Sequence, residues 1–128
     1  MNTNKSEIKR KILYAEDQES TAHLVKYKLE KEGFETIILN DGEHVVQTAI
    51  DIQPSLILLD LMLPIKDGLR ILKELKNTDK VKNIPVIMLS VQGEEQKILN
   101  ALNSGAVDYI LKPFSTSELS LRIKKVLA

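Results

Sequence analysis

The residues of this sequence that could do chemistry stand directly after short apolar runs. Glu16 and Asp17 follow one run, Asp60 and Ser90 follow two others, and Lys112 follows a fourth. If these runs are neighbouring parallel strands, their carboxyl ends place the five side chains at one edge of a sheet, where open α/β sheets bind ligands. A lone Asp after a strand is more often a helix cap or a turn residue, so the functional interpretation depends on all four strand ends together.

The residue types suit phosphoryl transfer beside a divalent cation. Clustered carboxylates repel one another, and the chain has no cysteine to act as a thiolate ligand, so a hard cation is their natural partner. Mg²⁺ prefers one or two carboxylates, several waters and a phosphate oxygen. Phosphoryl transfer needs an in-line nucleophile and positive charge on the equatorial oxygens. A carboxylate could be the nucleophile, Lys112 and Mg²⁺ could supply the charge, and Ser90 a hydrogen bond.

Five apolar runs of strand length must position these groups. They cover residues 12–15, 36–39, 56–59, 86–89 and 107–111, and most lack the polar alternation of a strand with one wet face. Continuous apolar runs are typical of strands covered on both faces, as in a parallel sheet. Between the runs, apolar residues recur at helical spacing. Strands that alternate with helices in this way predict an α/β fold, a doubly wound five-stranded parallel sheet with five helices.

Signals along the helical segments agree with this layout. Ala22, Val25 and Leu29 lie at helical spacing, and Gly33 is placed to end that helix. The span from Ser115 to Glu118 has the spacing of a capping box, which predicts the start of the last helix.

Composition excludes several classes of protein. Of 128 residues, 43% are apolar and 28% are charged, and Lys plus Arg balance Asp plus Glu at 18 each, so neither a nucleic-acid footprint nor a polybasic membrane signal is present. No apolar stretch approaches the ~18 residues of a membrane span, and the first ten residues lack a signal-peptide core. We therefore expect a cytoplasmic domain over residues 9–128, preceded by a flexible N-terminal segment over residues 1–8, with no direct nucleic-acid or membrane partner.

Four segments resemble the receiver domains of bacterial two-component response regulators. They are I-L-Y-A-E-D (12–17), L-I-L-L-D-L-M-L-P-I-K-D-G (56–68), P-V-I-M-L-S (85–90) and G-A-V-D-Y-I-L-K-P-F (105–114). They occur in the family's order and spacing, over roughly residues 9–127. The resemblance implies a flavodoxin-like fold with strand order 2-1-3-4-5.

The resemblance also implies the roles of the reactive and switching residues. Asp60 is expected to be the phosphoacceptor, and Lys112 to pair with the phosphoryl group, aimed by a cis peptide bond to Pro113. Ser90 is expected to be the hydroxyl that moves toward the phosphoryl group, and Tyr109 the ring that then changes rotamer. The family accepts phosphate from a sensor histidine kinase or phosphotransfer protein, and it signals through the fourth helix, fifth strand and fifth helix. On this basis the chain is a phosphoryl acceptor with self-dephosphorylating chemistry rather than a turnover enzyme, and its output domain or target is unknown.

The expected cofactor is Mg²⁺, for which Mn²⁺ can substitute. By the resemblance, Asp17, Asp60 and the backbone carbonyl of Met62 are its protein ligands. Glu16 is expected to assist through a coordinated water. Glu16 replaces the family's commoner Asp, a variation that should keep the metal role.

Other positions depart from the family pattern. The residue after the switch hydroxyl is normally small, and here it is Val91, a gateway residue that would crowd the route to Asp60. Charged positions that the winged-helix transcription-factor subfamily uses for dimerisation are replaced by Ile98, Asn103 and Val107, while those at Asp108 and Arg122 remain. We therefore expect a monomer or a weak phosphorylation-dependent dimer.

Two alternative functions belong to other classes of protein. Val91 alone favours an interaction module that keeps the fold but works without phosphorylation. A haloacid-dehalogenase-like phosphatase also uses an aspartyl phosphate, but its first strand should end in D-x-D. Here Asp17 is followed by Gln18 and Glu19, so the phosphatase is rejected.

Overall fold

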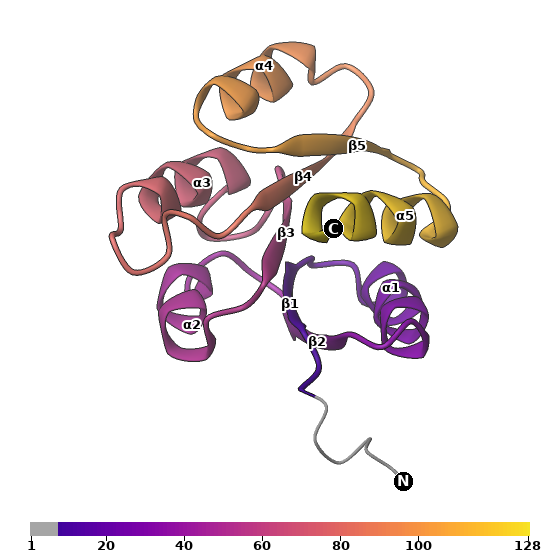
Figure 1. Ribbon diagram of the computed structural model, residues 1–128. Helices are drawn as coiled ribbons and strands as arrows, with labels where there is room; N and C mark the ends of the chain where they lie inside the picture. Colours follow the sequence, from indigo (N-terminus) through magenta and orange to yellow (C-terminus); the bar gives the residue numbers. More distant parts are fainter. Residues whose placement is uncertain (1–7) are drawn as a thin grey trace, which may run out of the picture.

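The computed structural model describes residues 8–128, so the expected flexibility of the N-terminal segment lies almost entirely outside the described residues. Strands and helices alternate along the chain (Figure 1). In order they are β1 Lys11–Ala15, α1 Glu19–Lys31, β2 Glu35–Leu39, α2 Val45–Ile52, β3 Leu56–Asp60, α3 Gly68–Lys76, β4 Val86–Val91, α4 Glu95–Asn103, β5 Asp108–Lys112 and α5 Thr116–Leu127.

The five strands form one parallel sheet in the order β2-β1-β3-β4-β5, which confirms the expected topology. Helices α1 and α5 cover one face, and α2, α3 and α4 cover the other (Figure 1). Each central strand sends alternate side chains into the two cores. In β3, for example, Ile57 and Leu59 join one core, while Leu56 and Leu58 join the other. Each buried aliphatic side chain stabilises the folded state by about 1.5–3 kcal/mol, so the central strands hold the groups at their ends in fixed positions.

Helix α1 ends at Gly33 as the sequence predicts. Gly33 has φ +98°, a conformation that glycine adopts without steric cost. Its N–H donates to the carbonyl of Glu30 at 3.1 Å, and the N–H of Phe34 donates to that of Leu29 at 3.0 Å. These two bonds make a complete Schellman motif, with the buried side chains of Leu29 and Phe34 beneath it.

The capping box of α5 forms only in part. The Ser115 hydroxyl accepts a hydrogen bond from the N–H of Glu118 at 2.9 Å, as expected. The Glu118 carboxylate, however, accepts from the Arg122 guanidinium at 3.2 Å, one helical turn further on. An opposite charge at i+4 gives that carboxylate a charged partner on the helix surface.

Strand β5 differs from the expectation of cover on both faces. It begins at Asp108 rather than at Val107, and only Ile110 is buried, whereas Tyr109 and Leu111 are exposed. The reason is the position of α4, which packs on β4 and α3 and leaves the outer side of this edge strand open. The fifth apolar run therefore contributes surface as well as core.

Within residues 8–128, no helix combines the length and the apolar character that crossing a membrane requires.

Candidate functional site

Lys112 joins the acidic groups at the carboxyl edge of the sheet. Its Nζ lies 2.5 Å from Oδ2 of Asp60 and 2.8 Å from Oε1 of Glu16. One carboxylate oxygen from each of Glu16, Asp17 and Asp60 lies within 4.8 Å of the other two. The Lys112–Pro113 peptide bond is cis, as predicted. Strand ends separated by up to 96 residues thus meet as the sheet topology requires.

Asp60 is fixed by the loop that follows it. It is the last residue of β3, it is buried, and its Oδ1 accepts a hydrogen bond from the N–H of Met62 at 3.0 Å. The loop closes where the N–H of Gly68, the first residue of α3, donates to the carbonyl of Leu61 at 2.9 Å. A Cβ on Gly68 would stand 2.2 Å from the carbonyl oxygen of Asp60, so glycine permits this close approach.

Glu16 is held by three donors. Its Oε1 accepts from Lys112 and from the Tyr14 hydroxyl at 3.1 Å, and its Oε2 accepts from the N–H of Gln18 at 3.2 Å. Sequence reasoning did not find this contact of Tyr14. The available signal was the spacing, because residues two apart on a strand point to the same side of the sheet.

The charges in the cluster change the acidity of its members. Burial raises the pKa of Asp60 above the ordinary value, and it outweighs the opposing hydrogen bond from Lys112. Burial alone would lower the pKa of Lys112, but hydrogen bonds to Asp60 and Glu16 reverse this and raise it. Both directions follow from one arrangement, in which a single ammonium ion is shared by two buried carboxyl groups.

The donor set fits Mg²⁺. Three carboxylates facing one ammonium leave two negative charges without compensation when all are ionised. Carboxylate oxygens are the ligands that Mg²⁺ prefers, and a divalent cation would balance that excess. Asp17 is exposed, so an ion held there would also keep access to water and to phosphate.

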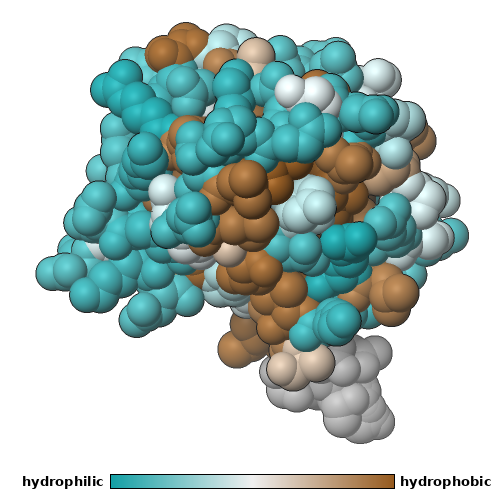
Figure 2. Space-filling model, turned by 90° about the horizontal axis from the view of Figure 1, so that it is seen from above, coloured by the Kyte–Doolittle hydropathy of each residue, from teal (hydrophilic) through white to brown (hydrophobic). Residues whose placement is uncertain are grey.

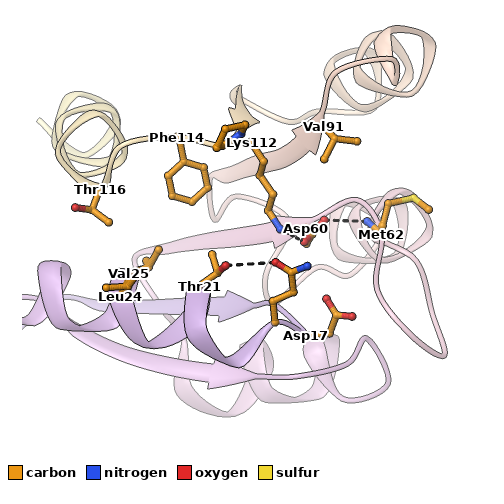
Figure 3. Close-up of a pocket in the computed structure, with 12 residues that line it drawn as sticks. Asp17, Thr21, Leu24, Val25, Asp60, Met62, Val91, Lys112, Phe114 and Thr116 are labelled. Atoms are coloured by element: carbon orange, nitrogen blue, oxygen red, sulfur yellow. Dashed lines mark hydrogen bonds and ion pairs between the residues drawn. The ribbon is translucent and has the colours of Figure 1, made fainter.

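Asp17, Asp60 and Lys112 line one end of a cleft of about 520 Å³ (Figure 3). Lys112 reaches across it from β5 to Asp60, with Val91 and Met62 on one side and Phe114 on the other. Val91 is 46% exposed and lines the cleft, and its role as a gateway residue stays a prediction. Sequence reasoning did not find the apolar wall beyond Lys112, because its members come from different elements: Leu24, Val25, Pro113 and Phe114.

The two expected switch residues lie outside the acidic cluster. Ser90 is buried near the end of β4, and its hydroxyl donates to the carbonyl oxygen of Val91 at 3.2 Å. Tyr109 is 36% exposed and lines a separate hollow of about 330 Å³ against α5. Their roles, like those of the metal ligands, stay predictions.

Comparison with known proteins places the chain in a family. A family model described as the response regulator receiver domain matches residues 12–124. The phosphate regulon transcriptional regulatory protein PhoB of Escherichia coli (strain K12) is 42% identical over 118 residues, 92% of this chain and 52% of that protein. The alkaline phosphatase synthesis transcriptional regulatory protein PhoP of Bacillus subtilis (strain 168) is 39% identical over 118 residues, 92% of this chain and 48% of that protein. The chain therefore spans about half the length of these curated relatives.

Solved structures agree with this placement. A putative response regulator from Chloroflexus aurantiacus J-10-fl superposes with a TM-score of 0.88 at 28% identity, covering 94% of this chain and 98% of that one. The receiver domain of NtrX from Brucella abortus does so with a TM-score of 0.83 at 33% identity, covering 91% and 97%. The chain belongs to the response regulator receiver domains, a family of signalling domains that in general are phosphorylated on an aspartate and bind Mg²⁺ at an acidic site.

Proposed function

We propose that Asp60 is the phosphoacceptor of this domain. The observation that carries the proposal is the contact between the Asp60 carboxylate and Lys112 at the open edge of the sheet. An Asp60 oxygen attacks the phosphorus of phosphohistidine or of a small acyl phosphate. The bond from phosphorus to the leaving nitrogen or oxygen breaks, and Asp60 carries an acyl phosphate.

Two side chains assist the transfer in this proposal. Lys112, already beside Asp60, supplies positive charge to the phosphoryl oxygens, and Ser90 donates a hydrogen bond to them after turning from Val91. Asp17, Asp60 and the Met62 carbonyl would hold Mg²⁺, with Glu16 acting through water. When bound, the ion supplies further positive charge for the phosphoryl group.

Val91 would control access to Asp60. Its side chain lines the cleft beside Met62 (Figure 3), and we propose that an incoming donor or water passes there. Valine is branched at Cβ, so its χ1 is restricted and it cannot readily swing aside. The proposal is that Val91 slows both formation and hydrolysis of the aspartyl phosphate.

The phosphodonor is proposed to be a sensor histidine kinase or a phosphotransfer protein, and the output surface to be the α4–β5–α5 face. Figure 2, seen from the side of α4, shows apolar surface bordered by hydrophilic residues. Exposed apolar side chains on these elements include Leu99, Tyr109 and Leu111. Phosphorylation would change this face through Ser90 and Tyr109, and an output domain or a separate target would bind it.

Two observations support a monomer or a weak phosphorylation-dependent dimer. Ile98 is buried within the domain, so this position offers no charged side chain to a dimer partner. Arg122 pairs with Asp108 of the same chain at 3.2 Å, so these two remaining charges already satisfy each other.

Intact-mass spectrometry after incubation with acetyl phosphate and Mg²⁺ tests the proposal. One phosphoryl group should add to the wild-type chain and none to Asp60→Asn. Asp51→Asn, an exposed change in α2, is the matched control and should be labelled like the wild type. Undiminished labelling of Asp60→Asn would place the nucleophile elsewhere, and no labelling of the wild type would favour the phosphorylation-independent module.

A further inference from the structure

The turn between β2 and α2 packs directly against the loop between β3 and α3. Gly42 is buried there, and its N–H donates to the carbonyl oxygen of Pro64 at 3.1 Å. A Cβ on Gly42 would stand 2.0 Å from the carbonyl oxygen of Lys66 and 2.7 Å from Cδ1 of Ile71. Any side chain at residue 42 would therefore push the tip of the β3–α3 loop away.

That tip is held in a strained turn. The carbonyl oxygen of Pro64 also accepts from the N–H of Lys66 at 2.7 Å, which closes a three-residue turn around Ile65. Ile65 has φ +72°, a conformation that is costly for a residue branched at Cβ. The Lys66 ammonium is anchored to the Glu74 carboxylate of α3 at 2.9 Å. Strained turns persist only where their surroundings hold them, and Gly42 is part of those surroundings.

The base of the same loop is fixed next to the acidic cluster. The N–H of Leu61 donates to Leu89 of β4, and the N–H of Gly68 donates to Leu61, each at 2.9 Å. Only the short stretch between these anchors can absorb a displacement of the tip. Met62 lies in this stretch, and its N–H orients the Asp60 carboxylate at 3.0 Å.

We infer that Gly42 is a positioning residue for the metal and phosphoryl site, acting through Pro64 and Lys66 on the Met62 backbone. The inference rests on the proposed function, in which the Met62 carbonyl and Asp60 hold the ion. Gly42 itself touches neither group. Its missing side chain lets the β2–α2 turn press the loop tip into place, and so sets where the Met62 carbonyl and the Asp60 carboxylate stand.

The test is the affinity for Mn²⁺, measured by electron paramagnetic resonance of the free ion during titration. Gly42→Ala should bind Mn²⁺ about 10–100-fold more weakly, the loss typical when support of metal ligands is removed. Gly33→Ala is the control: Gly33 has φ +98°, so alanine is strained there, but an added Cβ meets nothing within 4 Å, and Gly33 lies at the opposite edge of the sheet. It should lose thermal stability and keep its Mn²⁺ affinity. Equal affinity in Gly42→Ala and wild type, or equal loss in the two variants, would overturn the inference.

A second pair of variants decides the question if Gly42→Ala does not fold. Ile65→Pro forbids the positive φ at an exposed position without entering the core, and it should also weaken Mn²⁺ binding. Ile65→Ala, its control, should bind like the wild type, and unchanged affinity in Ile65→Pro would refute the inference. Asp17→Asn identifies the site. If the Asp17→Asn variant binds Mn²⁺ as tightly as the wild type, the proposed metal site and this inference both fail. If Asp17→Asn loses Mn²⁺ affinity while Gly42→Ala and Ile65→Pro keep full affinity, only the inference is overturned.

Discussion

Replacing Tyr14 by Phe removes one hydrogen bond from the acidic cluster and nothing else of substance. The Tyr14 side chain is fully buried in the core beneath the sheet edge, and its hydroxyl donates to Oε1 of Glu16 at 3.1 Å. Burial, followed by the charge of Glu16, raises the pKa of Tyr14, so the phenol stays a neutral donor. Phe has the same ring and fits the same space.

The size of the effect follows from the partners that remain. A hydrogen bond to a charged group contributes about 1.5–3 kcal/mol to folding. Glu16 keeps its contacts with Lys112 and with the Gln18 N–H, so its charge is not left alone in the interior. We therefore expect Tyr14→Phe to lower the free energy of unfolding of the metal-free protein by about 2 kcal/mol. With a urea m value of about 1–3 kcal/mol/M, the midpoint should fall by roughly 1 M.

Urea unfolding followed by circular dichroism in the presence of a chelator measures this change. The control is Tyr27→Phe, because Tyr27 is 66% exposed on α1, and its loss of a hydroxyl should change stability by less than about 0.5 kcal/mol. A Tyr14→Phe protein as stable as the wild type would refute the view that Glu16 needs a neutral donor as well as Lys112.

Three further predictions concern other parts of the domain. Val91→Ala should accelerate both phosphorylation by acetyl phosphate and hydrolysis of the aspartyl phosphate, by about tenfold for each 1.4 kcal/mol of steric barrier removed. Phosphate-release time courses measure these rates, and equal rates in wild type and variant would show that Val91 does not obstruct the cleft. Gly68→Ala should lower stability in thermal unfolding by about 1–3 kcal/mol, since its Cβ would stand 2.2 Å from the carbonyl oxygen of Asp60. The hydrogen bond from Lys124 is the main cause that lowers the pKa of Glu32 to about 2, so the stability that Glu32 contributes is present above its ordinary pKa of 4.5 and is lost as the pH falls toward 2. The urea midpoints of wild type and Glu32→Gln should differ at neutral pH and converge in acid, and a constant difference would contradict the linkage.

The fold could be predicted because its sequence signals are local and agree with one another. Continuous apolar runs mark strands buried on both faces, and Gly33 ends α1 through a backbone motif that needs only its own neighbours. The convergence of Asp17, Asp60 and Lys112 could be predicted as well, since strand ends of a parallel sheet meet at one edge.

What escaped prediction depends on how separate elements pack. Leu111 is exposed because α4 packs on α3 and β4 and leaves the outer side of β5 open. Nothing in the run 107–111 indicates where α4 packs. The cleft wall formed by Leu24 and Phe114 joins α1 to the β5–α5 connection, two segments some 90 residues apart. The contact of Gly42 with Lys66 likewise belongs to two loops, and the sequence shows each loop without its neighbour.

The proposed switch requires an element with two arrangements, and in this proposal the element is the Ser90 side chain. Its hydroxyl is bonded to the carbonyl oxygen of the next residue at 3.2 Å, a neutral bond with a net value of about 0.5–1.5 kcal/mol. A phosphoryl group on Asp60 would bring nearly two negative charges and strong acceptors to the adjacent strand end, and bonds to such charged acceptors contribute about 1.5–3 kcal/mol. The difference favours Ser90 turning toward Asp60. The hydroxyl would leave the carbonyl of Val91, whose partner on β5 is Lys112. The change would therefore reach the same edge strand that presents Tyr109.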